Sequence, residues 1–93
     1  MIIRNSAVLW RELDGEAILL YQQEGCSFNL NPVGTLIWKM LDGQHTPSDM
    51  ATAICEAYEV EHEQAQHDVE QLLDNLRQYN LLIDSDSTSP STV

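Results

Sequence analysis

The sequence predicts an α+β fold in which a three-stranded antiparallel sheet is followed by three helices. Strand-forming residues and tight-turn signals fill roughly the first thirty positions, and the apolar spacing then changes to a helical period. Prolines stand at two positions where helices would begin. With 93 residues, the chain is long enough for one domain and too short for two.

The first two strands are expected at Ala7–Leu13 and Glu16–Gln22, which flank the pair Asp14-Gly15. An Asp-Gly pair readily adopts the positive φ angles that a two-residue hairpin turn requires. After Gly25, a third strand is predicted because polar and apolar residues alternate from 26 to 30. One face of this strand would carry Cys26, Phe28 and Leu30, and the other Ser27 and Asn29.

Three helices are expected from residue 32 to about residue 79. Asn31 and Thr46 are good N-caps, and each precedes a proline at the first helical position. The third helix is expected at about His62–Tyr79. Apolar residues at helical spacing predict three buried stripes: Val33, Leu36, Ile37, Met40 and Leu41; Met50, Ala51, Ile54, Cys55 and Tyr58; and Ala65, Val69, Leu72, Leu76 and Tyr79.

A short apolar segment, Leu81–Ile83, is expected to close the domain, which would span residues 1–83. Residues 84–93 consist almost entirely of Ser, Thr, Pro and Asp. Because such a segment cannot bury enough apolar surface to offset its ordering entropy, it is predicted to be a disordered acidic tail. The whole arrangement, a small sheet beside a helix-turn-helix, is winged-helix-like.

The charge of the chain excludes nucleic acid, which is the usual ligand of winged-helix domains. The chain has 15 acidic residues and four Lys or Arg, a net charge of −11, and residues 42–83 contain Arg77 as their single Lys or Arg. Nucleic acids and anionic membranes are bound through cations, so neither is expected as a partner. With no signal-like N-terminus and no apolar run long enough to span a bilayer, we expect a cytoplasmic protein.

No residue pattern predicts catalysis, a cofactor or a metal site. His62 and His67 are five residues apart and would not share one face of a helix, and His45 is expected in a turn. Cys26 and Cys55 form no Cys-x-x-Cys pair and are interpreted as reduced, mostly buried thiols. The sequence therefore favours a binding protein over an enzyme.

The third strand offers the clearest functional feature. If the strands pair sequentially, Cys26–Leu30 lies at an edge of the sheet, with a row of unpaired backbone donors and acceptors. It contains no Pro, no Lys and no charge, the devices that usually protect such an edge. An unguarded edge can add an extended peptide as a further strand. The alternative is that the chain's own tail or a second copy covers it.

The sequence resembles the PqqD family of peptide chaperones, which act in the biosynthesis of pyrroloquinoline quinone and related products. The similarity covers roughly residues 7–83 and continues through Thr46, Tyr58-Glu59-Val60, Asp68-Val69 and Leu81-Leu82-Ile83. It includes Asp14-Gly15 and Gly25-x-x-Phe28, and its most specific part is the stretch Leu30-Asn31-x-x-Gly34-x-x-Ile37-Trp38-x-x-Leu41-Asp42-Gly43.

This resemblance implies a RiPP recognition element, a module that holds the leader of a ribosomally made precursor peptide and presents it to a modifying enzyme. A radical SAM enzyme and a leader protease are both conceivable partners. In the family, the leader adds antiparallel to the third strand, in the groove beside the third helix. The implied contacts are Cys26, Ser27, Phe28, Asn29 and Leu30 on the strand, and Gln66, Glu70, Leu73 and Arg77 on the helix.

Three further points of the sequence concern Trp38, the acidic surface and the alternative function. Trp38, which lies off the predicted stripe of its helix, could pack against the sheet or contact a partner. The acidic surface over residues 42–74 is expected to attract a basic segment of the leader or enzyme, with affinity falling as salt rises. A structural or regulatory winged-helix protein without a peptide ligand, dimeric through the same sheet edge, is the alternative function.

Overall fold

The computed structural model describes residues 2–84 and confirms the predicted fold class. A three-stranded antiparallel sheet of order β2-β3-β4 precedes three helices, and a second, two-stranded sheet joins the two ends of the domain. The elements are β1 (Ile2–Arg4), β2 (Leu9–Leu13), β3 (Glu16–Tyr21), β4 (Cys26–Leu30), α1 (Pro32–Lys39), α2 (Pro47–Tyr58), α3 (His62–Gln78) and β5 (Leu82–Asp84).

The two-stranded sheet was not predicted from the sequence. In it, β1 pairs antiparallel with β5, with Ile3 opposite Ile83. The apolar segment that follows α3 is thus a strand that reaches Asp84, one residue beyond the predicted domain boundary. The remaining residues of the predicted tail, 85–93, lie outside the described residues. This pairing joins segments that are about eighty positions apart in the chain.

The predicted turns and caps are confirmed. Asp14 and Gly15 have φ angles of 54° and 81°, as a two-residue hairpin turn requires. The Asn31 side chain accepts a hydrogen bond from the Gly34 backbone N–H at 2.7 Å, which caps α1. Thr46 and its partner three residues on form a reciprocal capping box at the start of α2. These local signals fix where the hairpin turns and where the helices begin.

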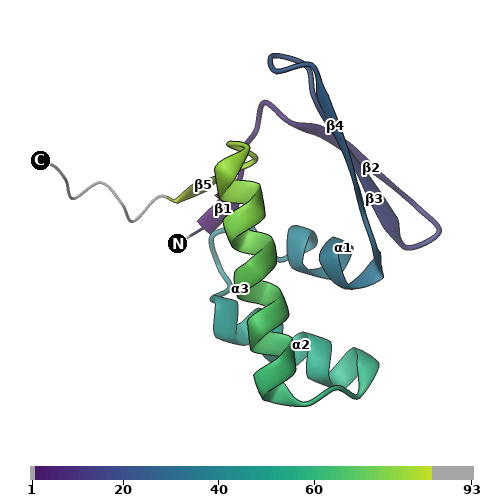
Figure 1. Cartoon of the computed structure of the whole chain (residues 1–93), viewed down its shortest axis with the longest axis vertical. Helices are drawn as coiled ribbons and strands as arrows, with labels where there is room; N and C mark the ends of the chain where they lie inside the picture. The colour runs from purple at the N-terminus through teal and green to yellow at the C-terminus, as the bar shows by residue number, and fades with distance from the viewer. Residues whose placement is uncertain (1, 85–93) are drawn as a thin grey trace, which may run out of the picture.

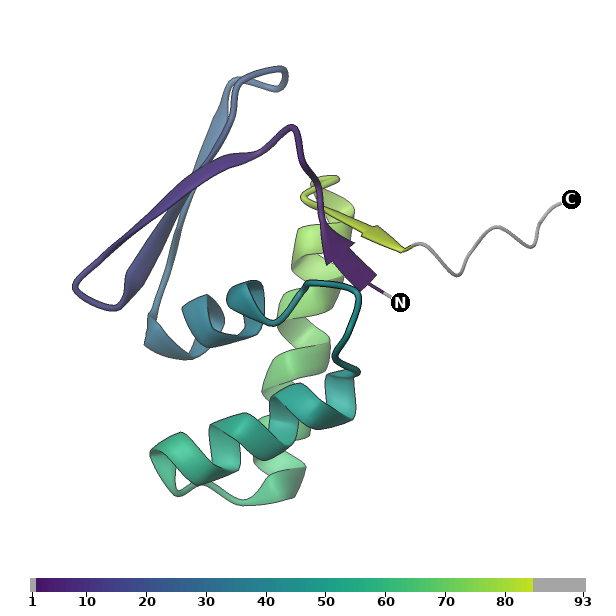
Figure 2. The same ribbon diagram turned by 180° about the vertical axis from the view of Figure 1, so that it is seen from behind.

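Figure 1 shows α3 running through the middle of the molecule, with α2 beside its N-terminal half. The reverse view in Figure 2 shows α1 between α3 and the three-stranded sheet. Both views place the β1–β5 pair next to the C-terminal end of α3. The buried side chains of all these elements form one core. The inner face of the three-stranded sheet packs on α1.

The packing interpretation of Trp38 is confirmed, because its side chain is fully buried. Its indole ring meets the edge of Trp10 from β2, with ring centroids 6.1 Å apart. Arg4 of β1 donates to the backbone carbonyls of Trp38 and Lys39, both at 3.0 Å, and its guanidinium lies over the Trp10 ring. A cation at the C-terminal end of a helix is favoured by the helix dipole. This cluster fastens α1 to both sheets.

Thr35 is the one polar side chain found buried among the described residues. Its hydroxyl accepts a hydrogen bond from the Ala17 N–H of β3 at 2.7 Å and donates one to the Leu30 carbonyl of β4 at 3.3 Å. One side chain of α1 thus completes the ladder between β3 and β4 at the point where β4 ends. It fixes the position of β4 relative to the helices.

Thr35→Val should destabilise the fold by about 1–3 kcal/mol, since the buried Ala17 N–H would lose its partner while the side chain keeps its shape. Urea denaturation followed by tryptophan fluorescence measures this change. Thr52→Val is the matched control, because the Thr52 hydroxyl is exposed on α2 and its loss should cost no more than about 0.5 kcal/mol. Equal stability of the two variants would contradict the role assigned to Thr35.

Candidate functional site

The strand β4 forms one edge of the three-stranded sheet, as the sequence predicted. No other strand among residues 2–84 pairs with its outer side. The predicted alternation is also present: Leu30 is buried and Cys26 and Phe28 are half-buried, whereas Ser27 and Asn29 are exposed. One face of the edge strand therefore lies toward the helices and the other toward solvent.

The pattern of hydrogen bonds shows which backbone groups of β4 point outward. The residues next to a two-residue hairpin turn, here Leu13 and Glu16, form a hydrogen-bonded pair, so Ala17 turns its N–H toward β4. Its bond to the Thr35 hydroxyl, which also contacts the Leu30 carbonyl, agrees with this direction. Because the direction alternates along a strand, the residues of β4 with outward N–H and C=O groups are Ser27 and Asn29.

A hollow of about 420 Å³ lies between β4 and the C-terminal half of α3. Apolar side chains from both elements form its base, and amide side chains stand at its rim. At one end the Phe28 and Tyr79 rings are in contact, with centroids 5.0 Å apart. The strand contributes Phe28, Asn29 and Leu30, the helix contributes Leu72, Asn75, Leu76 and Gln78, and the segment after the helix contributes Tyr79 and Leu81.

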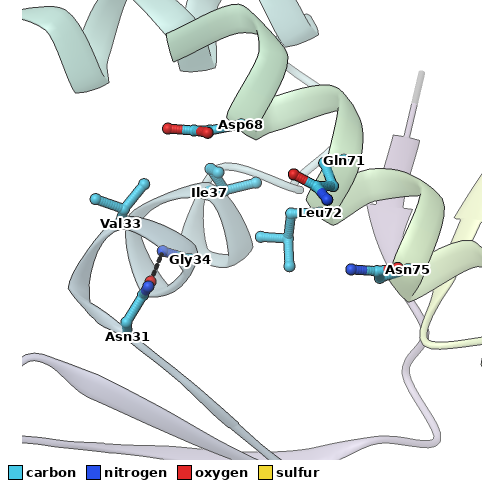
Figure 3. A pocket seen from close by; sticks show the side chains of 8 residues that line it. All are labelled: Asn31, Val33, Gly34, Ile37, Asp68, Gln71, Leu72 and Asn75. Atoms are coloured by element: carbon cyan, nitrogen blue, oxygen red, sulfur yellow. Dashed lines mark hydrogen bonds between the residues drawn. The ribbon is translucent and has the colours of Figure 1, made fainter. Parts of the chain in front are cut away.

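A second hollow, of about 310 Å³, continues from the first between α1 and α3. Leu72 and Asn75 line both hollows and so connect them. Figure 3 shows side chains from the two helices facing each other across this opening, with the Asn31 amide bonded to Gly34. Its lining residues are Asn31, Val33, Gly34, Ile37, Asp68, Gln71, Leu72 and Asn75.

The two hollows form one groove, and α3 runs along it in the direction opposite to β4. Phe28 lines the hollow that reaches Tyr79, whereas Val33, just after the end of β4, faces Asp68 near the beginning of α3. A chain that paired with β4 would therefore follow α3 over several turns.

Comparison with known proteins agrees with this geometry. Residues 16–82 match the family model described as coenzyme PQQ synthesis protein D (PqqD). The chain belongs to the PqqD family. The match covers the β3–β4 hairpin and all three helices, the elements that form the groove. The resemblance inferred from the sequence is thereby confirmed.

Two solved structures are similar to this member of the PqqD family. One is TbiB1 in complex with the TbiA(beta) leader peptide, with 32% sequence identity, a TM-score of 0.78, and coverage of 86% of this chain and 93% of that one. The other is lasso peptide synthetase B1 complexed with the leader peptide, with 25% identity, a TM-score of 0.79, and coverage of 89% and 98%. The comparison with curated proteins found no match.

The helical half of the predicted contact set does not line the groove. Gln66, Glu70 and Arg77 are exposed on α3 but are not among the residues that surround either hollow. Leu73, predicted as an apolar contact for the peptide, is only 4% exposed and belongs to the core. Their contact with a leader peptide therefore stays a prediction, although Leu73 has little surface left to offer a ligand.

The buried stripe of α3 is rotated by about one residue relative to the stripe predicted from the sequence. The predicted stripe included Leu72 and Tyr79, but the structure buries Leu73 instead, and Tyr79 is 48% exposed. Ala65 and Val69 are compatible with either choice, so spacing alone does not separate two adjacent leucines. The side of α3 that packs on α2 determines which of the two leucines is buried. The residues turned toward β4 are Leu72, Asn75 and Tyr79.

The groove itself is weakly charged. Its side chains are mostly apolar or amide groups, and Asp68 is the one ionisable carboxylate that lines either hollow. The pKa of another acid, Asp42, is lowered because its carboxylate accepts a hydrogen bond from the Gln44 backbone N–H and faces the His45 ring, but Asp42 does not line the groove. Among residues 2–84 there is no group of three potential metal ligands and no helix able to cross a membrane.

Two neighbouring leucines of α3 should respond differently to truncation. Leu73→Ala should destabilise the fold by about 2–5 kcal/mol, because it opens a cavity in the core. Leu72→Ala, at the half-buried wall of the groove, should cost less than about 2 kcal/mol. Urea denaturation of both variants checks this order, and the reverse order would contradict the assigned rotation of α3.

Proposed function

We propose that this protein is a non-catalytic adaptor that binds the leader segment of a ribosomally made precursor peptide. The observation that carries the proposal is the unpaired edge of β4 beside two adjoining hollows that share Leu72 and Asn75. Two similar structures contain a leader peptide, which supports the same conclusion. The groove is lined by apolar and amide groups, which suit binding rather than bond cleavage.

The leader adds to β4 as a fourth strand. The N–H and C=O groups of Ser27 and Asn29 point outward and supply four main-chain hydrogen bonds to it. Such bonds do not depend on the peptide's side chains, and each contributes about 0.5–1.5 kcal/mol net. They give affinity without selecting a sequence.

Selectivity comes from alternate side chains of the leader. A residue opposite Phe28 or Leu30 shares the face of those two residues and points into the hollow lined by Leu72 and Tyr79. A residue opposite Ser27 or Asn29 points to solvent. The leader therefore carries apolar residues two positions apart, and by similarity to the family it runs antiparallel to β4.

The adaptor presents the bound leader to an enzyme that modifies or cleaves the precursor. This partner is an enzyme such as a radical SAM enzyme or a leader protease. By holding the leader in one extended conformation, the adaptor removes part of the entropy that the enzyme would otherwise lose on binding. The acidic surface over residues 42–74 attracts basic segments of either partner.

Ser27→Pro tests the strand addition, because proline removes one outward-pointing N–H from β4. Binding of a labelled leader peptide should weaken about tenfold or more, through the lost hydrogen bond and the bulk of the ring at the edge. Fluorescence polarisation measures the affinity, with leader peptides taken from short precursors encoded beside the gene. Circular dichroism checks that the variant remains folded.

Two variants serve as controls. Ser27→Ala removes the hydroxyl and keeps the backbone N–H, and should bind the leader normally. Glu12→Pro places a proline at an outward-facing position of β2, the opposite edge, and should also bind normally. A folded Ser27→Pro variant with unchanged affinity would contradict the proposal. So would a stable dimer that Ser27→Pro dissociates, since a second copy would then occupy the edge.

A further inference from the structure

Asp68 differs from the other acidic side chains described in the structure. All of those are exposed, whereas Asp68 is half-buried, at the wall of the hollow between α1 and α3. Figure 3 shows its carboxylate above Val33, on the same opening as Leu72 and Asn75. A carboxylate that loses part of its hydration is stabilised when a cation or several donors reach it.

Within residues 2–84, the structure gives Asp68 one hydrogen-bond partner. Gln64, one turn earlier on α3, donates to its Oδ1 atom at 3.0 Å. No ion pair is formed by Asp68 within this part of the chain. The N-terminus of α1 opens on the same hollow, but its capping bond runs from Gly34 to Asn31 and not to Asp68.

The position of Asp68 matches the spacing of a strand added to β4. Asp68 lies four residues before Leu72, which corresponds to about 6 Å along the helix. Successive side chains on one face of an extended strand are about 7 Å apart. If one peptide residue lies opposite Leu30 and contacts Leu72, the next residue on that face lies beside Asp68.

We propose that the hollow between α1 and α3 binds a Lys or Arg side chain of the leader, paired with the Asp68 carboxylate. This proposal rests on the proposed function and adds a feature of the ligand. The basic residue lies two positions from the apolar residue opposite Leu30, on the side away from Phe28. The recognised segment thus has a basic residue and two apolar residues at alternate positions.

The other residues of the hollow suit such a side chain. Val33 and Leu72 supply apolar surface for its aliphatic stem. The amide oxygens of Gln71 and Asn75 can accept hydrogen bonds from the ammonium or guanidinium group alongside Asp68. The general negative charge of the chain attracts any basic peptide, but a single half-buried carboxylate in the groove selects the position of the basic residue.

Two capped peptides of equal composition test the proposal. The first, acetyl-TKTLTLTKT-amide, places lysine on the same face as both leucines, and its symmetric pattern serves either strand direction. The second, acetyl-KTTLTLTTK-amide, moves both lysines to the opposite face. Because the two peptides have the same charge and length, any difference in affinity reports the position of lysine. Isothermal titration calorimetry with the full chain measures both affinities.

The first peptide should bind the native chain about tenfold more tightly than the second, as expected for one charge-assisted hydrogen bond in a partly buried site. In Asp68→Asn this ratio should fall to about one. In the control Glu56→Gln, which removes the same charge from an exposed position on α2 away from both hollows, the ratio should stay near that of the native chain. Circular dichroism confirms the fold of both variants.

The outcomes separate this inference from the proposed function. If Ser27→Pro abolishes binding of both peptides but Asp68→Asn leaves their ratio unchanged, the peptide adds to β4 and the role of Asp68 is wrong. An equal affinity of the two peptides for the native chain would also contradict that role. If neither peptide binds up to millimolar concentration, or if Ser27→Pro has no effect, strand addition itself is contradicted.

Discussion

Backbone hydrogen bonding at β4 is the constraint on which the site depends. The inner side of β4 is fully engaged, because it pairs with β3 and its last carbonyl accepts a hydrogen bond from Thr35. Its outer side has no strand beside it among the described residues. Peptide groups require partners from protein or water, so a second extended chain can replace the water along this edge.

The rest of the fold holds this edge beside α3. Trp38 and Trp10 pack α1 against the sheet, and Arg4 connects β1 to the end of α1. The pairing of β1 with β5 joins the beginning of the domain to the segment that follows α3. Together these contacts keep β4 and α3 at a separation that leaves a groove instead of a closed core.

The groove combines two kinds of recognition. In the proposed complex, main-chain groups at Ser27 and Asn29 bind an extended peptide irrespective of its sequence. In the same proposal, the side chains of Leu72 and Tyr79 favour apolar leader residues at alternate positions, and Asp68 adds a charge farther along. The proposed adaptor, which must recognise one leader among many peptides, needs both, because backbone pairing alone does not discriminate.

The sequence by itself determined every feature that depends on neighbouring residues. The Asp14-Gly15 turn, the Asn31 and Thr46 caps and the alternation along β4 follow from local chemistry, and the motif shared with the PqqD family extended them to the three-stranded sheet and the three helices. Tertiary structure alone decided the β1–β5 pairing and the choice between Leu72 and Leu73. Strands of three residues carry too little pattern to indicate a partner eighty positions away, and adjacent leucines on a helix are distinguished only by what packs against them.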